Sequence, residues 1–222
     1  MTTFEPLTPE RRRAMTRQHL LEAAAMVFAR DGFQASSLDD IAATAGFTKG
    51  AVYSNFKSKD DLFLAVLDDR FERGRAAIRG VLDTPEARSP EKWKPLVASA
   101  VRESLWDDNW TMLFLEFVLY AARNPQARSK LAAWTRHSLS QVEQLLTEEY
   151  DSADTPPHYP PADLAMISVS LFDGLGVYRL IDPSFTSDQT LTAALQFLSD
   201  AIDIDLASAT DNSVAGHQAA TQ

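Results

Sequence analysis

The chain has no cysteine and only eight glycines among its 222 residues. The absence of cysteine excludes a disulfide framework, a thiolate metal site and a cysteine nucleophile. We expect no membrane span, because no apolar run approaches the roughly 20 residues needed to cross a bilayer. The first residues are polar and then basic, without the apolar segment of a secretory signal. The sequence therefore predicts a cytoplasmic protein, and its 45% hydrophobic content is enough for a sizeable core.

Motifs of catalysis and metal binding are also missing from the chain. Its four histidines lie in four different segments, and none pairs with another at the spacing of a helical metal site. There is no G-x-S-x-G element, phosphate-binding glycine loop or dinucleotide fingerprint. Acidic doublets such as Asp107-Asp108 and Glu148-Glu149 have the composition of solvated helix ends. We therefore expect no enzymatic activity, no bound metal and no cofactor.

The most informative stretch is residues 36–62, which has the pattern of a helix, a tight turn, a short second helix and the start of a third. Ser37 is a suitable N-cap, because its hydroxyl can accept an unpaired N–H of the first turn. Apolar residues then recur at i, i+3, i+4 and i+7 and form one inward-facing stripe. This stripe consists of Leu38, Ile41, Ala42 and Ala45. Gly46 stands where the helix must stop, since glycine adopts a left-handed terminal turn at little cost.

A second, shorter helix follows this turn, with Thr48 as its expected N-cap. Val52 and Phe56 are four residues apart and share its buried face. At about 100° per residue, Gly50 and Ser54 then point away from the core. A short helix with a small and polar outer face is suited to the major groove of DNA, where its N-terminal residues can reach base edges. The segment therefore predicts a helix-turn-helix DNA-binding unit.

The string LDDIAATAGFTKGAVYSNFKSKDDLF resembles the DNA-binding signature of TetR-family transcriptional regulators. The family pattern has a D-I-A-x-x-A-G run, a K-G-x-x-Y-x-x-F recognition helix and a K-x-x-L entry to the next helix. The residues that match in register are Asp40-Ile41-Ala42, Ala45-Gly46, Lys49-Gly50, Tyr53, Phe56, Lys59 and Leu62. The resemblance implies an all-α protein with an N-terminal three-helix head and a six-helix C-terminal body that binds a ligand and dimerises.

The resemblance also assigns DNA contacts by motif position. The candidate DNA-binding residues are Ser37, Thr44, Thr48, Lys49, Gly50, Ala51, Tyr53, Ser54, Asn55 and Lys59. Lys59 is interpreted as a phosphate contact, and Ser37, Thr44 and Tyr53 as further contacts to the DNA backbone. Ser54 and Asn55 occupy positions where many relatives have larger side chains, although asparagine can bind adenine through two hydrogen bonds.

Positive charge is scarce overall, and the formal net charge is −10. Residues 1–60 carry eight Lys+Arg and seven Asp+Glu, or +1, whereas residues 61–222 carry thirteen and twenty-four, or −11. The acidic remainder would be repelled by DNA, which favours docking through one end only. Arg11, Arg12 and Arg13 could reach phosphates or the minor groove, or could simply form a solvated helix start.

Proline and small polar residues divide the rest of the chain into further helices. We expect helices over residues 9–31, 59–83, 96–106, 110–123, 125–150, 163–181 and 187–206. Proline-rich breaks are expected at 84–95 and 151–161, because proline lacks the N–H that a helix interior needs. The predicted domains are a DNA-binding domain over 1–57, with the helix-turn-helix at about 37–56, an effector-binding and dimerisation domain over 58–206, and a disordered tail over 207–222.

The last two helices, 163–181 and 187–206, are both expected to be buried. The first is apolar nearly all round, as in a helix that packs on more than one side. Within the family these two helices pair with those of a second copy, so the resemblance implies a homodimer. Periodicity alone fits equally two helices that close the core of a monomer. A dimer would place two recognition helices about 34–36 Å apart and would require a roughly palindromic operator in double-stranded DNA.

Aromatic residues are concentrated between residues 93 and 134, which include all four tryptophans. Bodies of TetR-like proteins usually enclose a ligand pocket, so the resemblance implies a small-molecule effector. An aromatic lining with few polar groups, such as Glu116, suits a flat or lipophilic one. The candidate pocket residues are Trp106, Trp110, Phe114, Phe117, Tyr120, Trp134, His137, Phe172 and Tyr178. Aromatic residues at helical spacing are also typical of an ordinary core.

The function expected from the sequence is a DNA-binding transcriptional regulator, acting as a dimeric repressor that an effector releases from its operator. Repression is the family's usual mode and does not follow from these residues. Two alternatives stay open. One is a regulator that binds DNA without an effector, which a filled body would support. The other is a helical enzyme or ligand carrier that keeps the head as a relic, against which the intact Lys49, Tyr53 and Lys59 argue.

Overall fold

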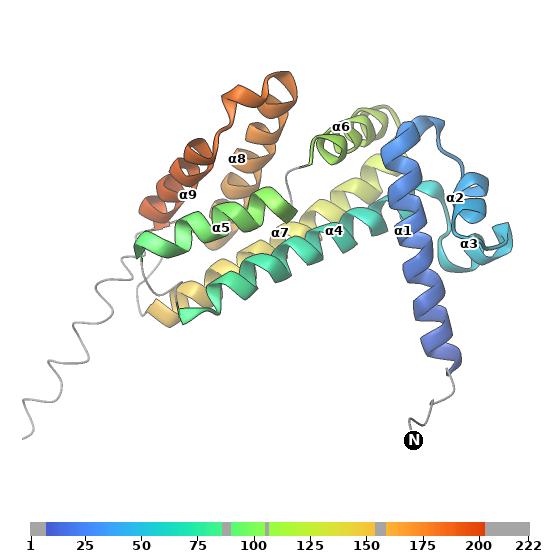
Figure 1. Cartoon of the computed structure of the whole chain (residues 1–222), viewed down its shortest axis with the longest axis horizontal. Helices are drawn as coiled ribbons and strands as arrows, with labels where there is room; N and C mark the ends of the chain where they lie inside the picture. Colours follow the sequence, from blue (N-terminus) through green and yellow to red (C-terminus); the bar gives the residue numbers. More distant parts are fainter. Residues whose placement is uncertain (1–7, 86–89, 105–106, 154–158, 203–222) are drawn as a thin grey trace, which may run out of the picture. The chain divides into compact units, whose positions relative to one another are not determined.

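The structure is a computed structural model that describes residues 8–85, 90–104, 107–153 and 159–202. These residues form nine α-helices and a short 3-10 turn, η2 (Pro183–Phe185), with no strand among them (Figure 1). The all-α fold predicted from the sequence is therefore confirmed. The chain divides into two compact units. The first comprises Met1–Asp69 with Met112–Trp134, and the second comprises Arg70–Thr111 with Thr135–Gln222.

The first unit contains the helix-turn-helix. Its elements are α1 (Pro9–Ala35), α2 (Leu38–Thr44), α3 (Lys49–Asn55) and parts of α4 (Lys59–Leu82), α6 (Asp108–Arg123) and α7 (Pro125–Ala153). Figure 1 shows α2 and α3 as two short helices beside α1, joined by a tight turn. α2 packs against both α1 and α3. The three-helix head expected from the sequence is thus present.

The ends of the head helices follow local signals in the sequence. The hydroxyl of Ser37 accepts the N–H of Asp40 at 3.1 Å, and the hydroxyl of Thr48 accepts the N–H of Ala51 at 3.3 Å. Each cap satisfies a backbone N–H that has no partner within its helix. Gly46 has a φ of +70°, the left-handed conformation that ends α2. The predicted caps and the predicted turn are confirmed.

α1 is longer than the sequence predicts. It runs past residue 31 to Ala35, with a kink at Gly32, whose φ is +79°. Glycine adopts this backbone conformation without the steric penalty that a Cβ brings. After the kink, the chain places Phe33 in the core, and the hydroxyl of Ser36 donates to the carbonyl of Phe33 at 2.9 Å. The extra turn is therefore held by burial and by a side-chain hydrogen bond.

Four phenylalanines form the centre of the first unit. Phe28 and Phe33 come from α1, Phe63 from α4 and Phe117 from α6, and all four are buried. Ring centroids are 5.2 Å apart for Phe28–Phe63, 4.8 Å for Phe33–Phe117 and 4.6 Å for Phe63–Phe117. Aromatic pairs at such distances add about 0.5–1.5 kcal/mol each beyond the burial of their surface. α6 therefore shares one core with the helices of the head.

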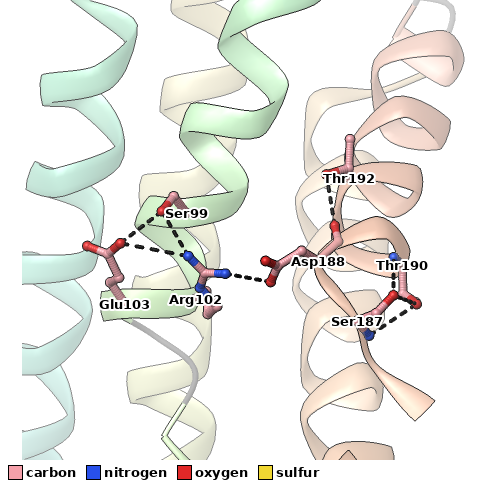
Figure 2. A network of polar contacts seen from close by, with 7 residues as sticks. All are labelled: Ser99, Arg102, Glu103, Ser187, Asp188, Thr190 and Thr192. Carbon is pink, nitrogen blue, oxygen red and sulfur yellow. Dashed lines mark hydrogen bonds and ion pairs between the residues drawn. The ribbon is translucent and has the colours of Figure 1, made fainter. Parts of the chain in front are cut away.

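The second unit includes α5 (Pro90–Ser104) and α9 (Asp188–Ile202), which lie side by side (Figure 1). Their shared apolar cluster consists of Val97, Ala98, Val101, Leu191 and Leu195. Figure 2 shows polar contacts between the same two helices. Arg102 of α5 donates to Asp188 at the start of α9, with 2.5 Å between Nη1 and Oδ1, and to Ser99 at 3.2 Å. Because the ion pair is partly exposed, we attribute the pairing of the two helices mainly to the apolar cluster.

The proline-rich breaks are shorter than the sequence predicts. α5 begins at Pro90, within the break expected at 84–95, and both the end of α7 and the start of α8 (Pro161–Ile181) lie within the break expected at 151–161. Pro90 and Pro161 occupy the first position of their helices. A backbone N–H at that position has no acceptor within the helix, so a proline there costs no hydrogen bond. Pro95 lies inside α5, where it removes one backbone hydrogen bond. The predicted tail, 207–222, is outside the described residues.

α8 carries an apolar surface that its own unit leaves uncovered. Met166, Ile167, Tyr178 and Ile181 are between 49% and 69% exposed. By length and composition alone α8 is apolar enough to cross a membrane, and only 17% of its most apolar window is buried. The expectation that no apolar stretch reaches this length is therefore wrong, because small residues within α8 do not interrupt its apolar character. The expectation that this helix is buried is not met within one chain.

Candidate nucleic-acid interface

The outer face of α3 is the candidate surface for DNA. Val52 and Phe56 are buried against the head, whereas Gly50, Tyr53 and Ser54 are exposed. Tyr53 exposes 51% of its surface, which is high for a large aromatic residue. The guanidinium of Arg17 on α1 lies over the ring of Phe56, 4.5 Å from its centroid. α3 is thus anchored by its inner face and by a cation–π contact, which leaves its outer face free for a partner.

Nine of the ten predicted DNA contacts lie on α2, on α3 or at their caps. Ser37 and Thr48 use their hydroxyls as helix caps. Ser54 and Asn55 each donate to the carbonyl of Ala51, at 2.9 and 2.8 Å. Of the remaining members on these helices, Thr44, Lys49, Gly50 and Tyr53 are exposed and Ala51 is partly buried. A contact from Asn55 to a base would therefore require its amide to leave the carbonyl of Ala51.

Lys49 forms an ion pair that the sequence did not suggest. Its ammonium lies 2.8 Å from Oδ1 of Asp39, in the first turn of α2. The hydrogen bond from Lys49 to Asp39 raises the pKa of the lysine, so the ammonium keeps its charge near neutral pH. The two side chains are 57% and 60% exposed, so the pair is accessible to a competing phosphate. In the sequence, this ion pair is indicated only by an aspartate ten residues before the lysine.

Lys59, the tenth predicted contact, points into the head. Its ammonium donates to three backbone carbonyls near the end of α1: those of Phe33 at 2.7 Å, Gln34 at 3.2 Å and Ser36 at 2.9 Å. It also lies over the ring of Phe33, 4.5 Å from the centroid. Burial lowers the pKa of Lys59. Since an ammonium has three N–H donors, the predicted phosphate contact would require one of these bonds to break.

Glu116 of α6 contacts the same residues from their N–H side. Its Oε2 accepts the N–H of Phe33 at 2.9 Å, and its Oε1 accepts the N–H of Gln34 at 2.7 Å. A Cβ added at Gly32 would lie 3.0 Å from Oε2, so the carboxylate fits closely against this glycine. Sequence reasoning placed Glu116 among the polar groups of a ligand pocket. The structure instead places it at the end of α1, and no local pattern links positions more than eighty residues apart.

A second charged residue ties α7 to the start of α4. Lys130 donates to the hydroxyl of Ser58 at 2.8 Å and lies 2.9 Å from Oδ1 of Asp61. Ser58 is the N-cap of α4, because its hydroxyl accepts the N–H of Asp61 at 3.1 Å. Burial opposes ionisation of Asp61, but the hydrogen bonds from Lys130 and Ser58 prevail and lower its pKa. Lys130 is a partner of this cap that the sequence did not reveal.

The predicted aromatic pocket residues are distributed over both units. In the first, Phe117 and Tyr120 belong to the cluster around Phe33, while the rings of Phe114 and Trp134 are 6.3 Å apart. In the second, Arg70 lies over the ring of Trp110, and Phe172 packs against the α5–α9 cluster. His137 and Tyr178 are exposed in the same unit, and Trp106 is outside the described residues. Four of the described members thus belong to the first unit and four to the second.

A groove of about 320 Å³ opens between α4 and α7 within the second unit. Its lining consists of Glu72, Arg75, Ala76, Arg79, Gln141, Gln144 and Leu145, which includes none of the predicted pocket residues. Both arginines have carboxylate neighbours, since Arg75 pairs with Glu72 and Arg79 lies 3.3 Å from Glu148. Within the described part of the chain, no group of three or more metal-binding side chains is close enough to hold an ion.

Comparison with known proteins identifies the head. Residues 20–66 match the family model "Bacterial regulatory proteins, tetR family". The uncharacterized HTH-type transcriptional regulator YfiR of Bacillus subtilis is 26% identical over 158 residues, which cover 70% of this chain and 76% of that protein. A putative TetR-family regulator from Rhodococcus sp. aligns with a TM-score of 0.67 and 21% identity over 85% of this chain and 98% of its own. FadR of Bacillus subtilis, solved in complex with stearoyl-CoA, aligns with a TM-score of 0.60 and 20% identity, over 83% and 98%.

The structural matches show a shared all-α fold, and the family match covers the helix-turn-helix from within α1 to within α4. Members of this family are DNA-binding transcriptional regulators and are generally not enzymes. The exposed face of α3, its buried anchor residues and its capped ends are the features such a regulator needs. Residues 20–66 of the chain thus form a DNA-binding domain of the TetR family of bacterial regulatory proteins.

Proposed function

We propose that the protein is a homodimeric repressor that binds a palindromic operator and leaves it when a small lipophilic or aromatic effector binds. The observation that carries the DNA-binding part is the outer face of α3, where Gly50 and Ser54 leave room for the edges of base pairs. Its place of action is the cytoplasm. The dimer and the effector are supported by separate features, and repression is proposed as the usual mode of the family.

Lys49, Tyr53 and Asn55 are the side chains of α3 that we expect to contact DNA directly. Lys49 can turn from Asp39 to a phosphate or a guanine, because both members of the ion pair are exposed. The hydroxyl of Tyr53 is accessible to a phosphate, and the amide of Asn55 can bind adenine once it leaves the carbonyl of Ala51. Ser37 and Thr44 would add contacts to the DNA backbone beside α2.

A second copy of the chain is the partner we assign to α8 and α9. Met166, Ile167 and Tyr178 on α8 and Phe197 on α9 are all about half exposed or more. Exposed apolar residues grouped on neighbouring elements mark protein–protein interfaces. The rival idea, that both helices close a monomer core, fits α9 through Leu191 and Leu195 but does not account for α8. A symmetric dimer would pair two recognition helices with two half-sites.

An apolar effector is supported by the shared fold and by two partly buried aromatic residues. FadR of Bacillus subtilis, which has this fold, was solved with stearoyl-CoA, so acyl-CoA thioesters are among the candidates. In this chain Phe114 and Trp134 are only partly buried and keep apolar surface available to a ligand. Several other predicted pocket residues are exposed or packed in a core. This second observation favours the alternative of a regulator that acts by DNA occupancy without an effector.

Selection of DNA by the purified protein tests the proposal. Genomic fragments bound at physiological salt are sequenced, with and without stearoyl-CoA and a panel of lipophilic aromatic compounds. We expect one short palindrome to be enriched and one class of compound to release it. Enrichment without release by any compound would support the effector-independent alternative. Absence of any enriched sequence would contradict the regulator itself.

A further inference from the structure

Residues 32–36 form the last turn of α1 and the start of its link to α2, and we call this segment the α1–α2 corner. Gly32 turns the chain with its positive φ, and Ser36 precedes the N-cap of α2. Directly after this turn, the N–H groups of Phe33 and Gln34 donate hydrogen bonds to a side chain. Whatever fixes this corner also fixes where α2 begins and, through α2, where α3 lies.

Two opposite charges hold the corner from two sides. The carboxylate of Glu116 accepts two successive N–H groups, at 2.9 and 2.7 Å, and the ammonium of Lys59 donates to three carbonyls between 2.7 and 3.2 Å. Phe33 is bound by both, through its N–H and its carbonyl. Hydrogen bonds to ionised groups are roughly twice as strong as neutral ones. The corner is therefore held by five charge-assisted bonds to two side chains.

The two charged residues come from different parts of the sequence. Lys59 begins α4, directly after the helix-turn-helix, so it belongs to the DNA-binding motif. Glu116 belongs to α6, and its partners are 82 and 83 residues away in the chain. Phe117, the next residue on α6, is buried against Phe33, so carboxylate and ring reach the corner together. A shift of α6 along its axis would carry both contacts with it.

We propose that Glu116 is a positioning residue for DNA binding, which holds the α1–α2 corner in the geometry that lets α3 enter the major groove. The inference rests on the DNA-binding part of the proposed function. In this role Glu116 makes the geometry of the corner depend on α6 as well as on the helices of the head. Glu116 itself touches no DNA in this scheme, and its removal acts on recognition only through the corner.

Glu116→Gln is the variant to test, in the full-length protein. The amide keeps the size of the side chain but directs an N–H₂ group at a backbone N–H, so one bond of the pair is lost. Glu143→Gln on α7 is the matched control, because it removes the same charge away from the head. Binding is measured by fluorescence anisotropy to a palindromic duplex enriched by the wild-type protein and to a scrambled duplex of the same composition. Hydrogen exchange of the amides of residues 33 and 34 is measured in parallel.

We expect Glu116→Gln to lower affinity for the selected palindrome by roughly tenfold and to leave affinity for the scrambled duplex within about twofold. The two corner amides should exchange faster, and Glu143→Gln should match the wild type in every measurement. Unchanged affinity for the palindrome despite faster exchange would overturn the proposal, since the bonds would then be purely structural. An equal loss on both duplexes, in step with a lower melting temperature, would overturn it as well.

Glu116→Asp covers the case in which the amide variant does not fold. It keeps the charge, but its shorter side chain cannot reach both N–H groups, so the same selective loss is expected to a smaller degree. Wild-type affinity in a folded Glu116→Asp protein would contradict the positioning role. Failure of the wild-type protein to enrich any duplex would instead count against the proposed function, which keeps the two failures distinguishable.

Discussion

At the scale of single residues, the two lysines of the DNA-binding motif have opposite environments. Lys49 is exposed and its pKa is raised by the hydrogen bond to Asp39, whereas Lys59 is partly buried and its pKa is lowered by that burial. The first lysine can exchange its carboxylate partner for a phosphate, and the second is committed to backbone carbonyls. The motif in the sequence gives both the same charge and does not distinguish them, because their partners are 10 to 26 residues away.

Removal of Asp39 should make DNA binding stronger and less selective. In Asp39→Asn, Lys49 loses its ion-pair partner and the DNA-facing surface loses one negative charge. We expect affinity for a scrambled duplex to rise about fivefold at low salt. The slope of log K against log salt should steepen by about one, the contribution of one additional phosphate contact. Anisotropy titrations at salt concentrations between roughly 50 and 200 mM measure both quantities, because electrostatic affinity for DNA changes steeply over this interval.

Asp31→Asn is the control for this prediction. It removes the same charge from the same unit, but its partner is Arg30 at the end of α1, 2.6 Å away, rather than a residue of α3. We expect a smaller gain in affinity and no change in the ratio between selected and scrambled duplexes. Identical behaviour of the two variants would show that overall charge, and not release of Lys49, controls binding.

At the scale of elements, the sequence predicted best what is decided locally. The N-caps Ser37 and Thr48 and the stop at Gly46 are each settled within four residues, and all are found in the structure. Helix ends near prolines were predicted less well, because proline is excluded from helix interiors but favoured at their first position. The contact of Glu116 with the corner was not predictable, since it depends on how α6 packs. The caps and the turn of the helix-turn-helix could thus be predicted from the sequence, whereas the contact from α6 could not.

The junction between α4 and α7 should lose stability in acid. Asp61 has a folded-state pKa below its ordinary value of 3.8, because its bonds to Lys130 and Ser58 outweigh the effect of burial. A carboxyl with a depressed pKa contributes stability above its ordinary pKa, and this contribution disappears as the pH falls through the folded-state value. Asp61→Asn should therefore melt at a lower temperature than the wild type at neutral pH, and the difference should vanish at the acid end.

Thermal melts followed by circular dichroism at a series of pH values check this linkage. Asp83→Asn is a suitable control, because it removes the same charge just beyond the far end of the same helix. A melting difference for Asp61→Asn that persists unchanged well below the ordinary pKa would contradict the assignment of the bond to an ionised carboxylate.

At the scale of the whole molecule, the proposed DNA-binding surface and the proposed dimer surface belong to different units of the chain. The residues that we expect to contact DNA belong to the first unit, and the exposed apolar residues of α8 and α9 belong to the second. The charge is divided in the same way along the sequence, with +1 over residues 1–60 and −11 over residues 61–222. A change at α8 should therefore alter assembly without altering the recognition surface of each protomer.

Ile167→Glu tests this separation. Ile167 is 49% exposed on α8, so a glutamate there remains solvated in a monomer but would be buried without a partner in a dimer. We expect the mass in solution to fall from twice 24.6 kDa to 24.6 kDa, measured by light scattering after gel filtration. Affinity for the palindrome should fall by about 100-fold, because two linked heads bind far more tightly than one. Affinity for a single half-site should stay the same.

Met112→Glu provides the comparison that makes this result specific. Met112 is 58% exposed on α6, so the substitution adds the same charge to an equally open apolar site that we do not assign to the interface. A dimeric Met112→Glu beside a monomeric Ile167→Glu would locate the contact on α8. If both variants dissociated, added negative charge on an already acidic chain would be the cause. If neither dissociated, α8 would not be the dimer surface, and its uncovered apolar residues would need a different partner.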